Sequence, residues 1–435
     1  MKIVDFLDQE YVNHASYTTI RGIPSFIDGL KNASRKCVWT MMTIPEGKRN
    51  RVDMFSNKVI EHTKYIHGSC ETTVVIAAKD FVGYPFPLFK SHGFFGSRLV
   101  NEAAATRYIE VSSHPNMKLL IDPADTPNLI HQVFDGYEIE PRFLMPALPI
   151  ALLKGAFGVS TGFKSVIFPR KLDSIVKYIQ GKTDTLIPYI EGYDGVVTET
   201  EQGHFTISGT FTRRTTTEVV VTEIPTGIEL SKYVKLLITL KEDKKIQSFK
   251  DVSDTKLGKF KFIIKFQREA LKKTTDKQLI KMLKLEKTVK EIYTFLDEDN
   301  HIIIFDSIYE MLDRWMEVKK GFERKKQKQK IKDILLLEQI ADSKVRFIKD
   351  VLSGKVVVAK STKPMIEKSL IKLSYKRVDG KFDYLLNMPI YNLSQTMINK
   401  LETQLSVLTD KLAEESSKDA VDEWMMGLRR MKNLS

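Results

Sequence analysis

An arginine and a tyrosine lie side by side in this sequence, at Arg107 and Tyr108, shortly after three alanines at residues 103–105. A tyrosine phenol has a pKa of about 10 in water and is a weak nucleophile at neutral pH. A neighbouring guanidinium favours the phenolate and also binds phosphate through paired hydrogen bonds. The pair therefore has the chemistry to attack a phosphodiester and form a phosphotyrosyl bond. The alternative is a structural role, with Tyr108 packed at a strand edge and Arg107 in solvent.

The composition is that of a globular protein with a normal core. Of the 435 residues, 42% are hydrophobic and 28% are charged, and the length predicts two to four domains. No window of about 18 uncharged apolar residues occurs, and the N-terminus lacks a signal-peptide pattern. The two cysteines, Cys37 and Cys70, fit a reducing cytoplasm and exclude a disulfide scaffold or a cysteine zinc site. The net charge of +13 favours a polyanionic partner such as DNA or RNA over a merely soluble basic protein.

The N-terminal part of the chain is expected to be mainly helical. Residues 2–17 mix apolar and charged positions like a short amphipathic helix, and a turn is expected over 21–24. Three helical segments with basic faces follow, at 28–42, 53–64 and 69–81, and they favour a helix-turn-helix that enters a DNA groove. A small helical bundle with solvated lysines is the alternative.

Four stretches of this region resemble the active-site motifs of type IIA DNA topoisomerases, in the family's order and at about its spacing. Residues 23–36, I-P-S-F-I-D-G-L-K-N-A-S-R-K, are similar to the family's I-P-x-x-x-D-G-L-K-P-x-x-R-K/R, except that Asn32 replaces the usual proline. Residues 65–68 (Y-I-H-G) and 78–83 (A-K-D-F-V-G) follow, and then F-G-S-R-L with A-A-A-T-R-Y across 95–108. The resemblance implies that Tyr108 cleaves one DNA strand and holds its 5′ end covalently.

The same resemblance implies roles for further residues. Arg35, His67 and Arg107 would surround the scissile phosphate, where cations placed in advance stabilise the charge of the transition state. His67 would act either as a hydrogen-bond donor or as the base toward the phenol, and both roles stay open. The other histidines, among them His92, are interpreted as ordinary. The basic residues expected to hold nearby DNA are Arg21, Lys31 and Lys36.

A glycine-rich stretch at 155–162 is not a nucleotide-binding P-loop, because no Gly-Lys-Ser/Thr follows it. Residues 158–167 instead resemble the family's G-x-x-x-G-x-x-(T/S)-x-I-P loop, with Phe168 intervening before the proline. The matching Ile167 would insert between base pairs and bend the DNA, and a core position for this side chain is the alternative. The residues expected on the adjacent phosphates are Lys164, Arg170 and Lys171.

The remaining chain is expected to hold a mixed α/β part and then two long helices. Strand patterns at 215–224 and 260–266 flank a helical pattern at 229–241, and the acidic residues 297–299 lie in an expected hairpin turn rather than a magnesium site. Helical patterns at 306–353 and 393–428 enclose a compact insert, as in an antiparallel coiled coil with a globule at its tip. Within the insert, residues 381–390 (K-F-D-Y-L-L-N-M-P-I) resemble the family's C-terminal dimer gate, with packing inside one chain as the alternative.

The expected fold class is therefore α+β and multidomain. Its parts are an N-terminal helical arm (1–17), a winged-helix DNA-cleavage domain with the catalytic tyrosine (18–172), an α/β tower domain (173–305), and a long antiparallel coiled coil (306–435) that carries a C-terminal dimer-gate globule at about 354–392.

The resemblance implies the DNA breakage and reunion subunit of an ATP-dependent type II DNA topoisomerase, an isomerase that acts as a homodimer on double-stranded DNA. The sequence has neither a nucleotide-binding motif nor an acidic magnesium signature, so ATP and Mg²⁺ are expected on partner subunits with the ATPase and metal-binding domains. The short chain is most similar to phage members of the family, which predicts a cytoplasmic, nucleoid-associated location in a phage-infected bacterium. The alternatives are a non-catalytic winged-helix DNA-bending protein and a metal-independent tyrosine strand-transferase.

Overall fold

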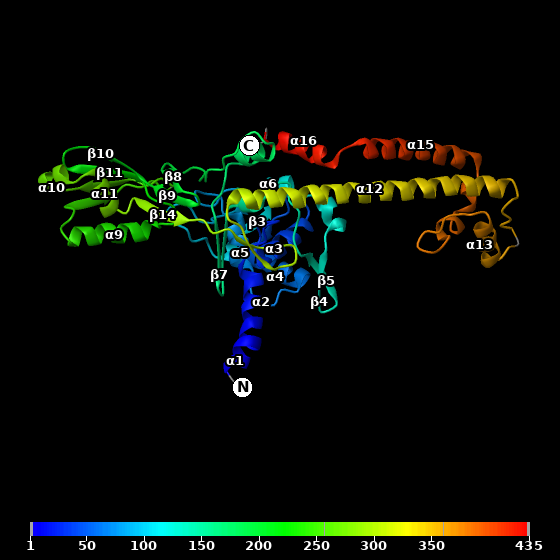
Figure 1. The fold of residues 1–435 in the computed structure, drawn as a ribbon, viewed down its shortest axis with the longest axis horizontal. Helices are drawn as coiled ribbons and strands as arrows, with labels where there is room; N and C mark the ends of the chain where they lie inside the picture. Colours follow the sequence, from blue (N-terminus) through cyan, green and yellow to red (C-terminus); the bar gives the residue numbers. More distant parts are fainter. Residues whose placement is uncertain (1–2, 256, 360, 433–435) are drawn as a thin grey trace. The chain divides into compact units, whose positions relative to one another are not determined.

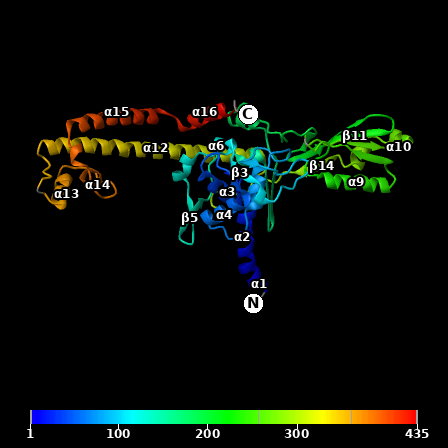
Figure 2. The same cartoon turned by 180° about the vertical axis from the view of Figure 1, so that it is seen from behind.

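The computed structural model describes residues 3–255, 257–359 and 361–432. The chain forms two compact units, each of which is described by itself. The first unit extends to Lys319 and takes in the chain again from Leu428, and the second comprises Lys320–Gly427. Figures 1 and 2 show the helices and strands of these units from opposite sides. No helix among the described residues is both long and apolar enough to cross a membrane.

The first unit begins with a helical stretch that is longer than expected. It consists of α1 (Ile3–Asp5), the π-helical segment η1 (Phe6–Tyr11) and α2 (Val12–Gly22). The backbone becomes extended at Ile23, because the residue before a proline is disfavoured in the helical region. The expected turn over 21–24 therefore starts only after Gly22.

Three helices and a small sheet follow, and they position the residues of interest. The helices are α3 (Asn32–Met42), α4 (Val52–Thr63) and α5 (Glu71–Ala78), close to the predicted segments. The antiparallel sheet has the order β1-β3-β2, with β1 at Asn50–Arg51, β2 at Phe89–His92 and β3 at Glu110–Ser113. Fully buried side chains such as Cys37, Val59 and Phe89 give the helices and the sheet a common core.

Two β-hairpins extend this part of the unit. The first joins β4 (His131–Phe134) to β5 (Tyr137–Pro141), after α6 (Pro115–Leu120) and η3 (Pro123–Asn128). The second joins β6 (Ala156–Ser160) to β7 (Phe163–Ile167), between α7 (Ile150–Lys154) and α8 (Leu172–Ile179). Strand β6 lies against α2 at Gly158, where an added Cβ would be only 2.7 Å from the carbonyl oxygen of Gly22.

The mixed α/β part of the first unit contains two antiparallel sheets. One has the order β14-β9-β8, and the other β10-β11-β13-β12. The strands are β8 (Val196–Glu201), β9 (His204–Ser208), β10 (Thr210–Arg213), β11 (Glu218–Glu223), β12 (Ser248–Asp251), β13 (Phe262–Lys265) and β14 (Glu286–Lys290). The helices are α9 (Leu230–Glu242), α10 (Arg268–Lys273) and α11 (Asp276–Met282).

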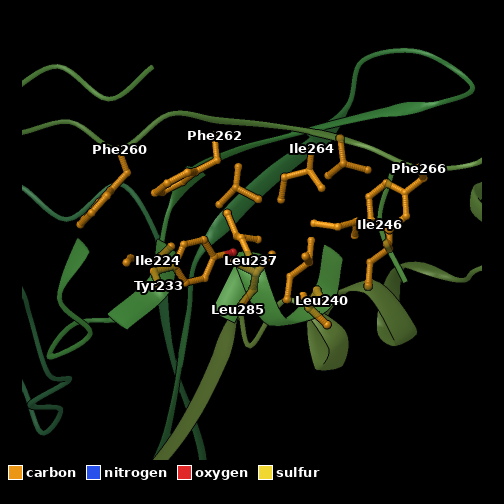
Figure 3. Close-up of a cluster of buried hydrophobic side chains, with 14 of the residues drawn as sticks. Ile224, Tyr233, Leu237, Leu240, Ile246, Phe260, Phe262, Ile264, Phe266 and Leu285 are labelled. Atoms are coloured by element: carbon orange, nitrogen blue, oxygen red, sulfur yellow. The ribbon is translucent and has the colours of Figure 1, made fainter. Parts of the chain in front are cut away.

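The core of the four-stranded sheet lies between its strands and α9. Figure 3 shows Tyr233 and Leu237 of this helix facing Phe262 and Ile264 of β13, and all four side chains are buried. Burial of each such apolar side chain contributes about 1.5–3 kcal/mol, so this cluster is the main source of stability for the sheet. The strand and helix patterns expected here are confirmed.

The first unit closes with a hairpin and the start of a long helix. Strands β15 (Thr294–Leu296) and β16 (Ile302–Ile304) pair across a turn in which the Asp297 carboxylate accepts hydrogen bonds from the amides of Asp299 and His301. The hairpin predicted for this segment is confirmed. Helix α12 (Ile308–Leu352) follows, and the indole of Trp315 donates a 2.8 Å hydrogen bond to the carbonyl of Ile27.

In the second unit α12 and α15 (Gln395–Ser417) lie side by side and antiparallel, as Figures 1 and 2 both show. Hydrogen bonds join Gln327 to Glu415, Glu338 to Thr409, and Lys349 to Glu402. Residue numbers rise along α12 and fall along α15 at these contacts, so the two helices run in opposite directions. A small globule contains α13 (Lys363–Lys372), α14 (Asp383–Leu386) and η4 (Ile390–Asn392), around buried Phe347, Leu370 and Phe382. Helix α16 (Ala420–Lys432) ends the described chain.

Candidate active site and nucleic-acid interface

Tyr108 lies at the end of the short 3-10 helix η2 (Thr106–Tyr108), directly before β3. Its side chain is 72% exposed, which contradicts the alternative in which it packs at a strand edge. The guanidinium carbon of Arg107 lies 4.8 Å from the centre of the Tyr108 ring. The amide of Tyr108 donates to the carbonyl of Ala105 at 2.8 Å, which holds the turn. The structure therefore presents a phenol to solvent with a cation against its face.

The pocket beside Tyr108 is lined by Arg49, Arg51, His92, Gly93, Arg107 and Glu110. Arg51 on β1 lies opposite Glu110 on β3, and Glu110 lies opposite His92 on β2. Residues directly opposite each other in an antiparallel sheet project from the same face, so this row faces one way. Sequence reasoning missed both arginines and took His92 as ordinary. The one sequence signal for these arginines was a basic run at 48–51. Only the pairing of the strands places this run beside the tyrosine.

His67 lies on the exposed loop after α4, in a second group of residues. The hydroxyl of Tyr17 on α2 is hydrogen-bonded to its Nε2 atom, and the ring of Tyr65 lies 5.5 Å away, centre to centre. Arg21 lies over the Tyr17 ring, 5.5 Å from its centre. Partial burial, with Arg21 and Lys36 as nearby cations, lowers the pKa of His67 below its ordinary value. At neutral pH the lowered pKa favours the uncharged imidazole.

The structure does not bring all the predicted catalytic residues together. Arg107 lies with Tyr108, whereas neither His67 nor Arg35 lines the pocket of the tyrosine. Tyr17 is a further residue that the sequence did not indicate, since nothing in its local pattern links it to a loop fifty residues away. The described chain thus holds two groups of candidate site residues, one around Tyr108 and one around His67.

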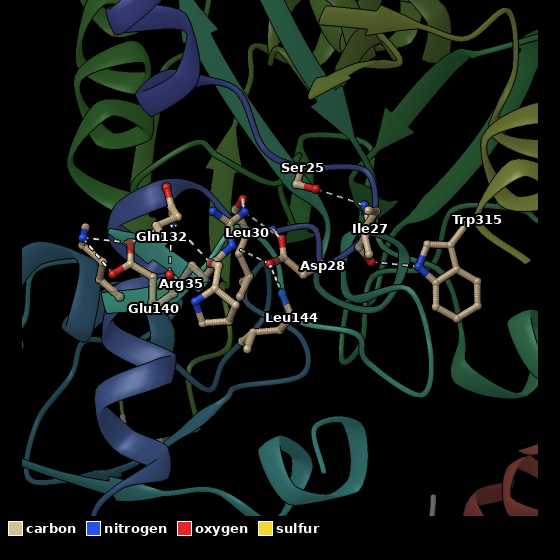
Figure 4. A network of polar contacts seen from close by, with 11 residues as sticks. Ser25, Ile27, Asp28, Leu30, Arg35, Gln132, Glu140, Leu144 and Trp315 are labelled. Carbon is tan, nitrogen blue, oxygen red and sulfur yellow. Dashed lines mark hydrogen bonds and ion pairs between the residues drawn. The ribbon is translucent and has the colours of Figure 1, made fainter. Parts of the chain in front are cut away.

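Arg35 and Lys36 are buried in this structure, whereas the sequence predicts Arg35 at the scissile phosphate and Lys36 on nearby DNA. Asp28 accepts hydrogen bonds from Nε and Nη2 of Arg35, at 2.6 and 3.1 Å. Lys36 donates to Glu140 at 2.8 Å and to the carbonyl of Thr63 at 2.9 Å. Figure 4 shows Arg35 directed toward Asp28, and Glu140 beside Gln132. A buried charge requires a partner, and these two cations already have one inside the protein.

Arg170 and Ile167 are buried as well, whereas the sequence predicts a phosphate contact for Arg170 and, for Ile167, either insertion between base pairs or a core position. The guanidinium of Arg170 forms two hydrogen bonds with Glu291, at 2.6 and 2.7 Å, and the amide of Phe168 donates to the same carboxylate. Ile167 is 4% exposed at the end of β7, so its side chain does not protrude toward a base pair. The periodicity of the sequence could not reveal the ion pair of Arg170, because its partner Glu291 lies 121 residues away.

Other predicted DNA-binding residues remain accessible. Lys164 and Lys171 are exposed, and Lys31 is half-buried with its ammonium 5.9 Å from the centre of the Phe157 ring. Burial lowers the pKa of Lys31. The exposed apolar residues of the β6–β7 hairpin are Phe157, Val159 and Phe163 rather than Ile167.

Comparison with known proteins decides the family. The family model for the A subunit of DNA gyrase and topoisomerase IV matches residues 21–430. The chain belongs to this family. It is 28% identical to the DNA topoisomerase medium subunit of Enterobacteria phage T4, over 98% of each chain. It is 26% identical to the mitochondrial DNA topoisomerase 2 of Dictyostelium discoideum, where 98% of this chain covers 35% of that protein. The chain thus spans about a third of this cellular relative but nearly all of the phage protein.

A solved structure has the same fold. The crystal structure of the DNA-binding, cleavage and re-ligation domain of Plasmodium falciparum topoisomerase II superposes with a TM-score of 0.83, over 100% of this chain and 64% of that one. At 23% identity this likeness concerns the fold, and it agrees with the expected mixture of helices and sheets.

Membership of this family confirms the main expectation from the sequence. The chain is a DNA-breaking and rejoining subunit of a type II DNA topoisomerase, an isomerase, and the expected similarity to a phage member is confirmed. Neither alternative, a DNA-bending protein or a strand-transferase, is favoured by any relative. Within the described part of the chain, no group of three or more His, Cys, Asp or Glu side chains is arranged to bind a metal ion.

Proposed function

We propose that Tyr108 is the nucleophile of the family's DNA cleavage reaction in this chain. Its phenol oxygen attacks the scissile phosphorus, the DNA 3′ oxygen leaves and takes up a proton, and the 5′ phosphate stays on the tyrosine. Attack by the 3′ oxygen on the same phosphorus reverses the step, so the strand is rejoined without a new source of energy. The observation that carries this proposal is the exposed phenol with Arg107 against its ring.

Arg107 would stabilise the charge that develops on the non-bridging oxygens during attack. A guanidinium donates several hydrogen bonds in one plane and keeps its charge at any working pH. Removal of one such donor typically raises a reaction barrier by about 2.7–4 kcal/mol. His67 would serve the same phosphate as a neutral group, either as a hydrogen-bond donor or as a base, with Arg21 beside it.

The parts of the fold would then take the roles expected from the sequence. Helices α3 to α5 with sheet β1-β3-β2 would form the winged-helix DNA-cleavage domain, and the sheets from β8 to β14 the tower beside the DNA. DNA contacts would come from Arg21, Lys31, Lys164 and Lys171, which are not enclosed by ion pairs of their own. The antiparallel α12 and α15 would be the coiled coil.

The active form would be a homodimer in which each Tyr108 cuts one strand of a duplex. A second duplex would pass through the break before resealing, which relaxes supercoils and separates linked circles. The small globule would form a second dimer contact. Its Ile390 and Tyr391 are 85% and 80% exposed and would contact the other copy of the chain, whereas Leu385 is buried within its own chain.

Magnesium and ATP would be bound by partner subunits. Among the described residues, no three or more His, Cys, Asp or Glu side chains are grouped to hold a metal ion, and no step of the proposed chemistry is assigned to a metal on this chain. The name of the phage T4 relative, a medium subunit, supports the existence of such partners. The phage origin of this relative supports action in a phage-infected bacterium, where the chain would work on the nucleoid in the cytoplasm.

The test is to mix the chain with its partner subunits, duplex DNA and Mg²⁺, to quench with detergent, and to sequence the DNA-linked peptide. We expect Tyr108 on a 5′ DNA end and no adduct with Tyr108→Phe, although that variant still binds DNA. An adduct on a 3′ end, or one formed without partner and magnesium, would support a strand-transferase. Unchanged topoisomerase activity of Tyr108→Phe would refute the proposal.

A further inference from the structure

We propose that Arg49, Arg51 and His92 form a second phosphate subsite beside Tyr108, which binds the backbone of the cleaved strand next to the scissile phosphate. The proposal rests on Tyr108 being the nucleophile, because that places the DNA strand in this pocket. It assigns a binding role to three residues that belong to none of the sequence motifs of the family described above.

Strand pairing brings the three residues to one place. Arg51 of β1, Glu110 of β3 and His92 of β2 form a row across the sheet, and Arg49 directly precedes β1. All four line the pocket that contains Tyr108. Since Tyr108 comes two residues before Glu110 and lines the same pocket, a strand attached to the phenol would have this row beside it.

The charge of the pocket favours an anion. Three guanidinium groups, of Arg49, Arg51 and Arg107, line it together with one carboxylate, that of Glu110. Arg51 has an exposed ion pair with Asp53 at 3.2 Å, which is weak in water, and among the described residues Arg49 has no carboxylate within ion-pair distance. Unlike the buried Arg35 and its Asp28, these side chains are exposed and available to a phosphate.

His92 adds a neutral hydrogen-bonding group to the same face. Its Nε2 atom lies 2.9 Å from the hydroxyl of Ser112. Partial burial, together with the nearby cations Arg49 and Lys90, lowers the pKa of His92, and Glu110 opposes this shift. The lowered pKa favours the uncharged ring at neutral pH, and this form would offer an N–H to a phosphate oxygen without adding to the repulsion among the arginines.

The subsite differs from the place of the scissile phosphate. That phosphate is bonded to the Tyr108 oxygen in the intermediate, and Arg107 lies against the same ring. A DNA strand carries a charge about every 3.4 Å along the helix axis, so a neighbouring phosphate would lie within reach of the cations beside Tyr108. A cation pair there would keep the cut strand aligned for resealing.

The experiment measures the salt dependence of duplex binding by the full chain carrying Tyr108→Phe, which cannot cut. Arg49→Gln and Arg51→Gln are added singly and together. The control is Arg314→Gln, because Arg314 is an arginine with similarly exposed ion pairs that does not line the pocket of Tyr108. Removal of each phosphate contact should lower the slope of log K against log salt by about 0.9, so that the decrease in affinity between about 50 and 200 mM salt becomes about 3.5-fold smaller for each arginine replaced.

We expect a lower slope in both single variants, a further decrease in the double variant and no change in the control. An unchanged slope in the double variant would overturn the subsite. The covalent adduct assay with Tyr108 intact separates the phosphate subsite from the proposed role of Tyr108 as nucleophile. Lower slopes in the arginine variants, together with no adduct at Tyr108, would refute only the role of Tyr108. Protonation of His92 in acid should add a charge to the subsite and make the slope of log K against log salt steeper. For His92→Gln we expect the slope at neutral pH to be unchanged and this steepening in acid to be absent. Steepening that persists would remove His92 from the subsite.

Discussion

The exchange of Arg35 for alanine decides whether this residue supports the fold or contacts DNA. The Asp28 carboxylate is fully buried and accepts from two Arg35 nitrogens and from the amides of Leu30 and Leu144, both at 3.0 Å. Removing one partner of a buried pair leaves the other charge without compensation, at a cost of about 3–5 kcal/mol. Arg35→Ala and Asp28→Ala should therefore destabilise the first unit by similar amounts.

A double variant sharpens the test. In Asp28→Ala combined with Arg35→Met, neither charge remains, so the loss of stability should be smaller than the sum of the single losses. A purely catalytic Arg35 predicts something else: a barrier raised by about 2.7–4 kcal/mol, an unchanged stability, and no comparable effect of Asp28. The two roles therefore differ in which measurement responds.

The assay is amide hydrogen exchange at Leu30 and Leu144, because a chain with two compact units need not unfold in one step. Arg142→Ala is the matched control, since its pair with Asp299 is exposed and should contribute only about 0–1 kcal/mol. If the amides of Leu30 and Leu144 in Arg35→Ala are as well protected from exchange as in the unsubstituted protein, but DNA cleavage is lost, the structural interpretation of Arg35 is wrong.

Four further changes have expected outcomes. Arg21→Gln should raise the pKa of His67 toward its ordinary value, because one of the cations that lower it is removed. A chemical-shift titration of labelled histidine measures this pKa, and an unchanged value would contradict the placement of Arg21 beside His67. Gly158→Ala should lower the melting temperature through a loss of about 1–3 kcal/mol, since its Cβ would meet the backbone of α2. Gly321→Ala, in an open position of α12, should instead stabilise by about 0.8–1.0 kcal/mol. Leu237→Ala should cost about 2–5 kcal/mol and expose amides of β13 to exchange, while amides of α15 remain protected.

Local sequence patterns predicted most of the elements. The apolar stripes of 28–42 and 53–64 correspond to α3 and α4, and the alternation at 260–266 corresponds to β13. These predictions succeed because helix and strand periods are properties of a few consecutive residues. The helix over 2–17 was predicted too short, since its end depends on the backbone restriction before Pro24 rather than on apolar spacing.

The candidate site was predicted less completely. Motifs indicated Tyr108, Arg107 and His67, but no motif indicated Arg49, which reaches the pocket through strand pairing, or Tyr17, which is bonded to His67 across fifty residues. Residue type and the motifs suggested contacts with DNA or its scissile phosphate for Arg35, Lys36 and Arg170, all of which are buried. Side-chain type alone cannot tell a solvated cation from one enclosed by a carboxylate.

By itself, the sequence determined the chemistry available to this protein: a phenol next to a guanidinium, an excess of positive charge, and motifs in the order of the topoisomerase family. Only the tertiary structure decided which cations are free to act. Lys36 meets Glu140 across 104 residues and Arg170 meets Glu291 across 121, so both charges are neutralised inside the fold, while Arg49 stays exposed beside Tyr108. The reason is physical: a buried charge requires a partner at contact distance, and that distance is set by the folded chain and not by position along it.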